Sequence, residues 1–140
     1  MSIYVDANVL VSTFVEDEFS KKAEHFFEAG TRGLHISDFV RAEFASVMGR
    51  LFRMKRLNLA EAREILAVFD IWASQKFEPV ETQTADVRTA ENLLRDLTLG
   101  LRAPDAINIA IAQRLGAELA TFDKKMAAAA SKLGVTIAGI

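Results

Sequence analysis

Apolar residues recur along this chain with two spacings, one typical of buried strands and one typical of amphipathic helices. Continuous runs of β-forming residues predict buried strands at residues 3–5, 34–36 and 117–122. Residues 77–80 form a fourth candidate, and Pro79 within it favours a position at a sheet edge. Residues 135–137 predict a short final strand.

Between the strands, apolar residues recur every three or four positions, which predicts helices. A helix begins directly after Asp6, and the others cover residues 16–29, 39–51, 59–72, 84–100, 104–115 and 123–133. Asn58 is expected to cap the long helix that follows it, and Gly116 to close the helix before it. Residues 104–115 are apolar nearly all round, so we expect this helix to lie buried against the sheet.

Strands that alternate with helices predict a parallel sheet covered on both faces, because each crossover places a helix against the sheet. The expected fold class is α/β: a three-layer α/β/α sandwich around a mostly parallel sheet of four to five strands. At 140 residues the chain is long enough to bury a substantial core, and we expect one domain over residues 1–140.

Composition narrows the class of protein. The chain is 51% hydrophobic and 26% charged, as compact globular proteins are, and no apolar run approaches the roughly 20 residues of a membrane helix. It has no cysteine, so disulfides and thiolate metal sites are excluded, which fits a reducing compartment. The first strand begins almost at once, which leaves no room for a secretion signal. We therefore expect a cytoplasmic protein with no membrane attachment.

Charge gives little support for a nucleic-acid partner. The net charge is −2, whereas nucleic-acid binders are commonly basic. Basic residues do gather at positions 50–56 and 124–125, although a solvated helix face is the favoured interpretation of each cluster. Charge alone therefore argues mildly against RNA.

Acidic residues stand where predicted strands end or predicted helices begin. Asp6 ends the first strand, and Asn8 follows two residues later. Asp105 lies in the first turn of the apolar helix, and Asp123 follows the strand that contains Thr121. Because parallel strands end at one edge of their sheet, these positions become neighbours. Taken singly, each acid has an ordinary alternative, since Asp and Asn are favoured caps of helix N-termini.

Glu43 is the unusual acid, because its spacing from Phe39, Val40 and Val47 places it on the apolar face of its helix. An unpaired buried charge costs several kcal/mol, so this carboxylate should reach either water at the sheet edge or a cation. A salt bridge or a surface position is the alternative for Glu43.

Together these acids predict a metal site formed by Asp6, Glu43, Asp105 and Asp123. Clustered carboxylates raise one another's pKa unless a cation neutralises them. Oxygen ligands without cysteine, and with only two histidines in the chain, favour Mg²⁺ or Mn²⁺ over zinc. A magnesium ion that keeps several waters beside one or two carboxylates is the kind of site that hydrolyses phosphodiesters.

The segments around these acids resemble the PIN-domain nucleases and, among them, the VapC-type toxins of bacterial toxin–antitoxin pairs. The resemblance spans nearly the whole chain and rests on VDANVL, SDFVRAEF, LRAPDAINIAIA and ATFDKKM. Asn8 stands where the family often has Ser or Thr, and Met126 where an aromatic often follows the last acid, but neither departure removes a carboxylate. The resemblance implies a metal-dependent endoribonuclease that forms a homodimer and is held inactive by a cognate antitoxin.

Our mechanistic hypothesis gives the predicted site residues separate roles. Three acids position the principal Mg²⁺ or Mn²⁺ directly or through water: Asp6, Glu43 and Asp105. Asp123 completes the site, and Thr121 or Asn8 orients a ligand or the attacking water. Cleavage of RNA would then proceed in line, without a covalent enzyme intermediate.

Two other functions stay open at this point. A phosphatase of the haloacid-dehalogenase type would use Asp6 as its nucleophile, although that chemistry expects a second Asp where Asn8 stands. A dimeric RNA- or protein-binding module on the same fold would keep the acids only as helix caps and would bind no metal. The long apolar stripes of the helices 39–51 and 59–72 are compatible with a dimer face or partner groove, and also with plain core.

Overall fold

A computed structural model describes residues 2–30 and 33–140 and contains a four-stranded parallel sheet. The strands lie in the order β3-β2-β1-β4, and they are β1 (Ile3–Val5), β2 (Leu34–Ser37), β3 (Glu78–Val80) and β4 (Glu118–Ala120). The first strand is central and β3 lies at an edge, as predicted. The predicted strand at residues 135–137 is wrong, because the pairing there is one isolated bridge between Leu119 and Ile137.

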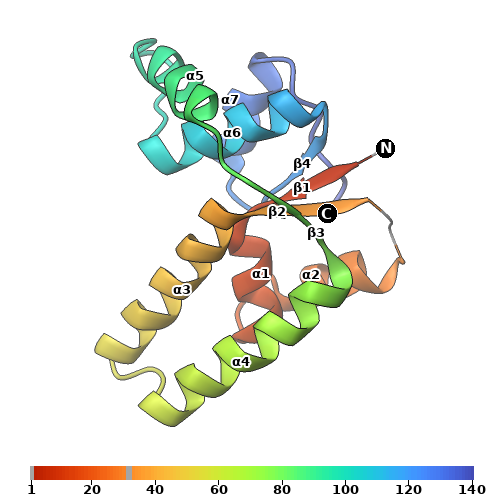
Figure 1. Ribbon diagram of the computed structural model, residues 1–140, viewed down its shortest axis with the longest axis vertical. Coiled ribbons are helices and arrows are strands. Elements are labelled where there is room, and N and C mark those ends of the chain that lie inside the picture. The colour runs from red at the N-terminus through yellow and green to blue at the C-terminus, as the bar shows by residue number, and fades with distance from the viewer. Residues whose placement is uncertain (1, 31–32) are drawn as a thin grey trace.

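Helices cover both faces of the sheet, so the predicted three-layer α/β/α sandwich is confirmed (Figure 1). One face carries α1 (Ala7–Phe14), α2 (Ser20–Glu28), α3 (Asp38–Arg53) and α4 (Leu59–Lys76). The other carries α5 (Thr84–Leu94), α6 (Ala103–Leu115) and α7 (Lys124–Lys132). Helices α3 and α4 reach away from the sheet and are joined by a turn at their far end (Figure 1).

Side-chain caps set several helix boundaries as the sequence predicts. Asn58 and Glu61 form a reciprocal capping box at the start of α4. The Ser37 hydroxyl accepts a hydrogen bond from the backbone N–H of Val40 and so begins α3 directly after β2. Gly116 adopts a left-handed conformation with φ of 60°, which ends α6 and lets the chain turn into β4.

Helices α2 and α5 are several residues shorter than predicted because local side-chain hydrogen bonds form turns instead. Asp17 accepts a hydrogen bond from the backbone N–H of Phe19, so α2 begins only at Ser20 rather than at residue 16. Asp96 accepts from both the N–H and the hydroxyl of Thr98, which forms a turn after α5 ends at Leu94. Leu97, which lies within the predicted helix 84–100, is therefore outside α5 and 88% exposed.

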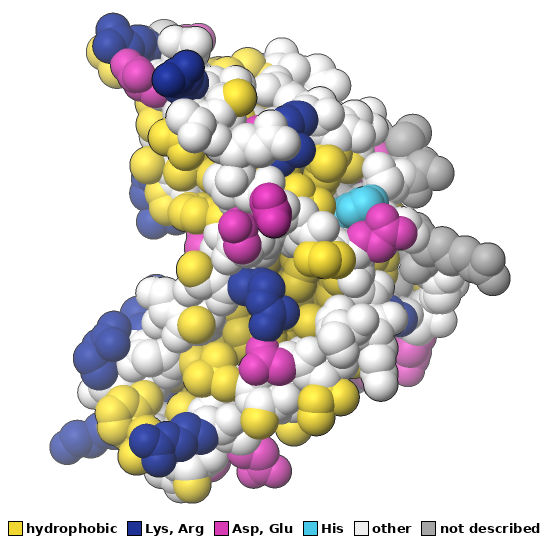
Figure 2. Space-filling view, in the orientation of Figure 1, with side chains coloured by type: hydrophobic (Ala, Val, Ile, Leu, Met, Phe, Trp, Pro, Cys, Tyr) yellow, Lys and Arg dark blue, Asp and Glu magenta, His cyan; other side chains and the backbone are white. Residues whose placement is uncertain are grey.

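The core packs against both faces of the sheet. On the α3–α4 side the buried and half-buried aromatic rings meet mostly edge to face: Phe14, Phe27, Phe44, Phe69, Trp72 and Phe77. On the other side, α6 buries Ile109 and Ile111 completely, as its apolar sequence predicts. The surface is hollowed between the α3–α4 side of the molecule and the side that carries α5, α6 and α7 (Figure 2). No helix in the described part of the chain is long and apolar enough to cross a membrane.

Candidate active site

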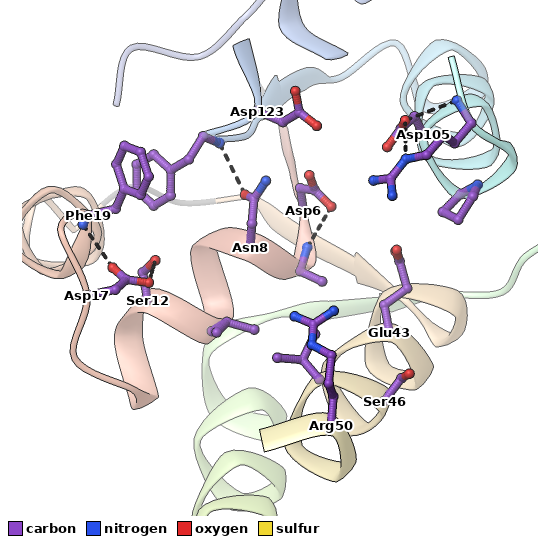
Figure 3. A pocket seen from close by; sticks show the side chains of 16 residues that line it. Asp6, Asn8, Ser12, Asp17, Phe19, Glu43, Ser46, Arg50, Asp105 and Asp123 are labelled. Atoms are coloured by element: carbon purple, nitrogen blue, oxygen red, sulfur yellow. Dashed lines mark hydrogen bonds and ion pairs between the residues drawn. The ribbon is translucent and has the colours of Figure 1, made fainter. Parts of the chain in front are cut away.

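The carboxyl ends of β1 and β4 open into a cavity of about 580 Å³. Its lining includes all four acids predicted from the sequence: Asp6, Glu43, Asp105 and Asp123. Each comes from a different segment, namely the end of β1, the second turn of α3, the first turn of α6 and the N-cap of α7. Figure 3 shows these four side chains around one space. Asn8 also lines the cavity, whereas Thr121 lies buried beside it.

Asp6 is the most deeply placed of the four acids, with 6% of its surface exposed. One carboxylate oxygen accepts a hydrogen bond from the backbone N–H of Ala7 at 2.8 Å, so Asp6 does cap α1. The other oxygen accepts from the hydroxyl of Thr121, also at 2.8 Å. Asp6 can therefore both cap α1 and line the cavity, because the turn that begins α1 also brings its carboxylate to the edge of the sheet.

Thr121 and Asn8 hold this side of the cavity together. The Asn8 amide donates to the Thr121 hydroxyl at 3.0 Å, and its carbonyl oxygen accepts from the backbone N–H of Phe122 at 3.1 Å. The same hydroxyl accepts from the backbone N–H of Asp123 at 3.1 Å. Asp123 in turn caps α7 through the N–H of Met126. Thr121 and Asn8 thus bind protein groups around the acids, and this fixes the positions of Asp6 and Asp123 relative to each other.

Glu43 is held from the opposite side by a buried relay that the sequence only partly suggests. The Asn108 amide donates to the Glu43 carboxylate at 2.8 Å, and the Asn108 carbonyl oxygen accepts from the hydroxyl of Tyr4 at 2.7 Å. The Tyr4 oxygen also lies 2.6 Å from the hydroxyl of Ser37. The sequence places Asn108 one turn from Asp105, yet its amide bonds to Glu43. From the sequence alone, Tyr4 is predicted only as part of a buried strand. Its hydroxyl is the signal that was missed, because a buried tyrosine hydroxyl usually needs a hydrogen-bond partner.

Crowding and burial raise the pKa of two of these acids. Burial raises the pKa of Asp6 to about 6, against the hydrogen bonds from Thr121 and Ala7, and the charges of Asp105 and Asp123 raise it further. Burial likewise raises the pKa of Glu43 to about 7, with the Asn108 hydrogen bond opposing it and nearby acids adding to it. Without a further cation, both carboxyl groups therefore keep their protons at pH values well above those at which free carboxylic acids lose them.

Two arginines also line the cavity. The guanidinium Nε of Arg102 lies 3.6 Å from a carboxylate oxygen of Asp105, and its side chain is 79% exposed. The same Asp105 oxygen accepts from the backbone N–H of Arg102 at 3.2 Å. Arg50, which belongs to a basic cluster interpreted as a solvated face, lines the cavity from α3. These side chains are at the mouth and leave Asp6 without a direct cationic partner among the contacts of the described residues.

The donor set fits a hydrated divalent cation better than a closely coordinated one. Within residues 2–30 and 33–140, no group of three His, Cys, Asp or Glu side chains is close enough to hold an ion. Mg²⁺ commonly takes only one or two carboxylates and keeps several waters, and a cavity of about 580 Å³ has room for them. Raised pKa values at Asp6 and Glu43 are a further sign of unneutralised carboxylates, which a cation would stabilise.

Comparisons with known proteins agree with the fold. The PIN domain family model matches residues 3–132. Ribonuclease VapC3 of Pyrobaculum aerophilum is 28% identical over 127 residues, which are 91% of this chain and 93% of the relative. The crystal structure of VapC20 from Mycobacterium tuberculosis, a sarcin-ricin loop cleaving toxin, has a TM-score of 0.74 at 21% identity, covering 91% of this chain and 95% of that one.

A toxin–antitoxin complex from Klebsiella pneumoniae has a TM-score of 0.60 at 22% identity, covering 89% of this chain and 88% of that one. At such identities the solved structures show a shared fold, and the family model carries the assignment. The comparisons favour the resemblance seen in the sequence over the phosphatase and over the binding module. The match to the family model covers nearly all of the chain, and the chain belongs to the PIN domain family.

Proposed function

We propose that this chain, as a single PIN-like domain over residues 1–140, is a metal-dependent endoribonuclease and the toxin of a type II toxin–antitoxin pair. The observation that carries the proposal is the convergence of Asp6, Glu43, Asp105 and Asp123 on one cavity from four separate segments. Membership of the PIN family and the 28% identity to a ribonuclease named VapC3 support a nuclease. The proposed reaction is hydrolysis of an RNA phosphodiester bond by water.

The proposed cofactor is Mg²⁺ or Mn²⁺, held by the four acids either directly or through water. Bound there, the ion would neutralise charge at the scissile phosphate and make the attacking water more acidic. Asp6, Glu43 and Asp105 would position the ion directly or through water, because a cation offsets the burial and crowding that raise the pKa of Asp6 and Glu43. Asp123, at the N-cap of α7, would complete the set.

The remaining polar residues act as positioning residues in this proposal. The Thr121 hydroxyl fixes one carboxylate oxygen of Asp6, and Asn8 fixes Thr121 and the backbone beside Asp123. Asn108 performs the equivalent task for Glu43. In this arrangement the carboxylates keep their positions whether or not a substrate is bound, which is the preorganisation that electrostatic catalysis requires.

The proposed partners are an RNA substrate, a cognate antitoxin and a second copy of the chain, all in the cytoplasm. Support for a protein partner comes from apolar side chains left uncovered on the α3–α4 arm. Its turn and its outer face expose large hydrophobic residues: Phe52 at 42%, Met54 at 57%, Leu59 at 46%, Val68 at 49% and Ile71 at 63%. Arrays of exposed apolar side chains commonly mark protein interaction surfaces.

Cleavage of structured RNA with and without EDTA tests the chemistry. Wild-type protein should cut RNA when Mg²⁺ or Mn²⁺ is present, lose the activity in EDTA and regain it when the metal is restored. Calorimetry with Mn²⁺ should give binding heat that is lost in Asp105→Asn and kept in Asp96→Asn, a matched change at an exposed acid outside the cavity. Full RNA cleavage in EDTA, or equal heat from both variants, would contradict the proposed metal site.

A further inference from the structure

Phe19 and Phe122 form a stacked aromatic pair in the lining of the acid cavity. Their ring centroids are 4.6 Å apart and their planes differ by 11°. Both side chains are half-buried, and both line the same cavity as Asp6 and Asp123. In Figure 3, Phe19 lies on one side of this space and Asp105 on the other, with Asn8 and Asp6 between them.

This pair differs from the other aromatic rings of the molecule. The core aromatics of the α3–α4 side meet mostly edge to face within the buried cluster. Phe19 packs flat on Phe122 and stands apart from that cluster in the described part of the chain, whereas Phe122 packs against it. The Phe19 ring therefore contributes little to the core, and its position at the cavity calls for another explanation.

Hydrogen bonds hold both phenylalanines in place. The backbone N–H of Phe122 donates to Asn8, directly between Thr121 and Asp123. The backbone N–H of Phe19 donates to Asp17 at 2.8 Å, and the hydroxyl of Ser12 on α1 donates to the second oxygen of that same carboxylate, also at 2.8 Å. The two rings are thus fixed relative to the end of β1, where Asp6 lies.

We propose that the stacked pair Phe19–Phe122 is a platform on which a nucleobase of single-stranded RNA stacks beside the acid cavity. This inference rests on the proposed nuclease function and adds how the substrate is positioned. A flat aromatic surface binds the face of any base, so it orients a nucleotide with little preference for sequence. Stacking a base here would bring its phosphates towards Asp6 and Asp123, because Phe122 immediately precedes Asp123 in the chain.

The platform is tested through binding, separately from cleavage. A single-stranded RNA oligonucleotide with 2-aminopurine placed at one position after another is titrated with protein carrying Asp6→Asn, which is expected to be inactive. Stacking should quench the 2-aminopurine fluorescence at one or two positions. Adding Phe19→Ala should abolish this quenching and weaken RNA binding by roughly 5- to 150-fold, the range for loss of one stacked base.

Matched variants separate stacking from bulk apolar contact. Phe19→Trp should keep both the quenching and the affinity, whereas Phe19→Leu should lose most of both despite an apolar side chain of similar volume. Leu97→Ala, a truncation of an 88% exposed apolar side chain outside the cavity, should leave RNA affinity unchanged. Mn²⁺ calorimetry on the Phe19 variants with Asp6 restored checks that the acids stay in place.

Failure of the platform is distinguishable from failure of the nuclease proposal. If Phe19→Ala or Phe19→Leu binds RNA as tightly as the parent and quenches equally, the platform is overturned, whatever the cleavage assays give. If wild-type protein shows no metal-dependent cleavage but the Phe19 effects hold, the nuclease function fails while the base-binding surface stands.

Discussion

Asp6 and Asp86 are two buried aspartates whose surroundings give them opposite acidities. Their exposed fractions are 6% and 2%. Burial raises the pKa of both, but at Asp86 the hydrogen bonds from Arg114 and from the backbone N–H of Gln83 outweigh it and lower the pKa. Arg114 donates to both carboxylate oxygens of Asp86, at 2.8 and 2.9 Å. Among the described residues, the Asp6 carboxylate accepts hydrogen bonds only from the Thr121 hydroxyl and the backbone N–H of Ala7, and its pKa is raised to about 6.

The difference separates a structural acid from a candidate functional one. Arg114 and Asp86 join α6 to α5, and the Arg114 guanidinium also donates to the carbonyl of Glu81, so this charge is neutralised by the fold itself. Among the described residues, Asp6 is buried and Glu43 half-buried without such an ion pair. Burying carboxylates that way costs stability, and a cost of this kind concentrated at one cavity is typical of sites that bind charged ligands.

The largest expected effect comes from removing the cavity charge. Asp6→Asn should lower metal-dependent RNA cleavage by roughly a thousandfold or more, since a metal-centred interaction contributes several kcal/mol to the transition state and each 1.36 kcal/mol is tenfold in rate. Its free energy of unfolding at pH 8 without metal should stay equal or rise, because the substitution removes the charge of a buried carboxylate. A urea titration measures this, and marked destabilisation would contradict the assignment of Asp6 as a site acid.

Removing Arg114, the cation that pairs with Asp86, should lower the free energy of unfolding and leave RNA cleavage unchanged. Arg114→Met leaves Asp86 buried without its cation, which should lower the free energy of unfolding by about 3 kcal/mol at pH 7. Cleavage by the fraction that remains folded should not change. Arg95→Met is the matched control, because the Arg95–Glu91 pair is exposed on both sides and should contribute less than about 0.5 kcal/mol. Equal losses in the two variants would remove the distinction.

The free energy of unfolding should depend on pH in two ways, one set by the acids with a raised pKa and one by Asp86, whose pKa is lowered. Asp6 keeps its proton in the folded state up to pH about 6 but loses it in the unfolded chain near pH 4. The folded state therefore binds more protons in this window, and the free energy of unfolding should fall by on the order of 2 kcal/mol as pH rises from 4 to 6. Glu43, with a pKa of about 7, extends the fall towards neutral pH.

Asp86 acts in the reverse sense, because its folded pKa is lowered. Its contribution is present above pH about 4 and is lost as the pH falls further, through the lowered pKa. Urea titrations in EDTA from pH 3 to 8 on wild type, Asp6→Asn and Asp86→Asn resolve the two limbs. In the plot of unfolding free energy against pH, Asp6→Asn should reduce the fall between pH 4 and 6. Asp86→Asn should reduce the loss of stability below pH 4. A wild-type curve that rises between pH 4 and 7 would contradict the raised pKa values.

Much of the fold follows from the sequence because the patterns are local. Asn58 with Glu61 and Gly116 define helix ends through neighbours a few residues away, and these boundaries are as predicted. The isolated bridge at Ile137 and the early end of α5 before Leu97 were mispredicted. The end of α5 depends on hydrogen bonds to the side chain of Asp96, which apolar spacing does not report. Where the final strand was predicted, one isolated bridge to Leu119 forms.

The acids of the site are predictable from the sequence, and the groups that surround them are less so. Strand ends in a parallel sheet converge, so the order of strands and helices along the chain is enough to place Asp6 and Asp123 together. Asp105 begins a helix that follows α5 rather than a strand, so strand order alone does not place it. The relay from Tyr4 through Asn108 to Glu43 joins residues up to 104 positions apart, and nothing in local spacing indicates which amide meets which acid. The stacked pair of Phe19 with Phe122 was missed for the same reason.

The smallest expected effect tests the hydroxyl that supports Asp6. Thr121→Val keeps the shape of the buried side chain but removes the donor to Asp6 and the acceptor for Asn8 and for the N–H of Asp123. We expect a loss of about 1–2 kcal/mol in the free energy of unfolding and a roughly tenfold lower cleavage rate, because one hydrogen bond to a charged group is lost and two donors are left unpaired. Thr121→Ser retains the hydroxyl and should recover most of the cleavage rate, whereas a merely steric role for Thr121 would make Val the better substitute. Comparing the two variants in RNA cleavage and in urea unfolding therefore decides whether the hydroxyl itself positions the Asp6 carboxylate.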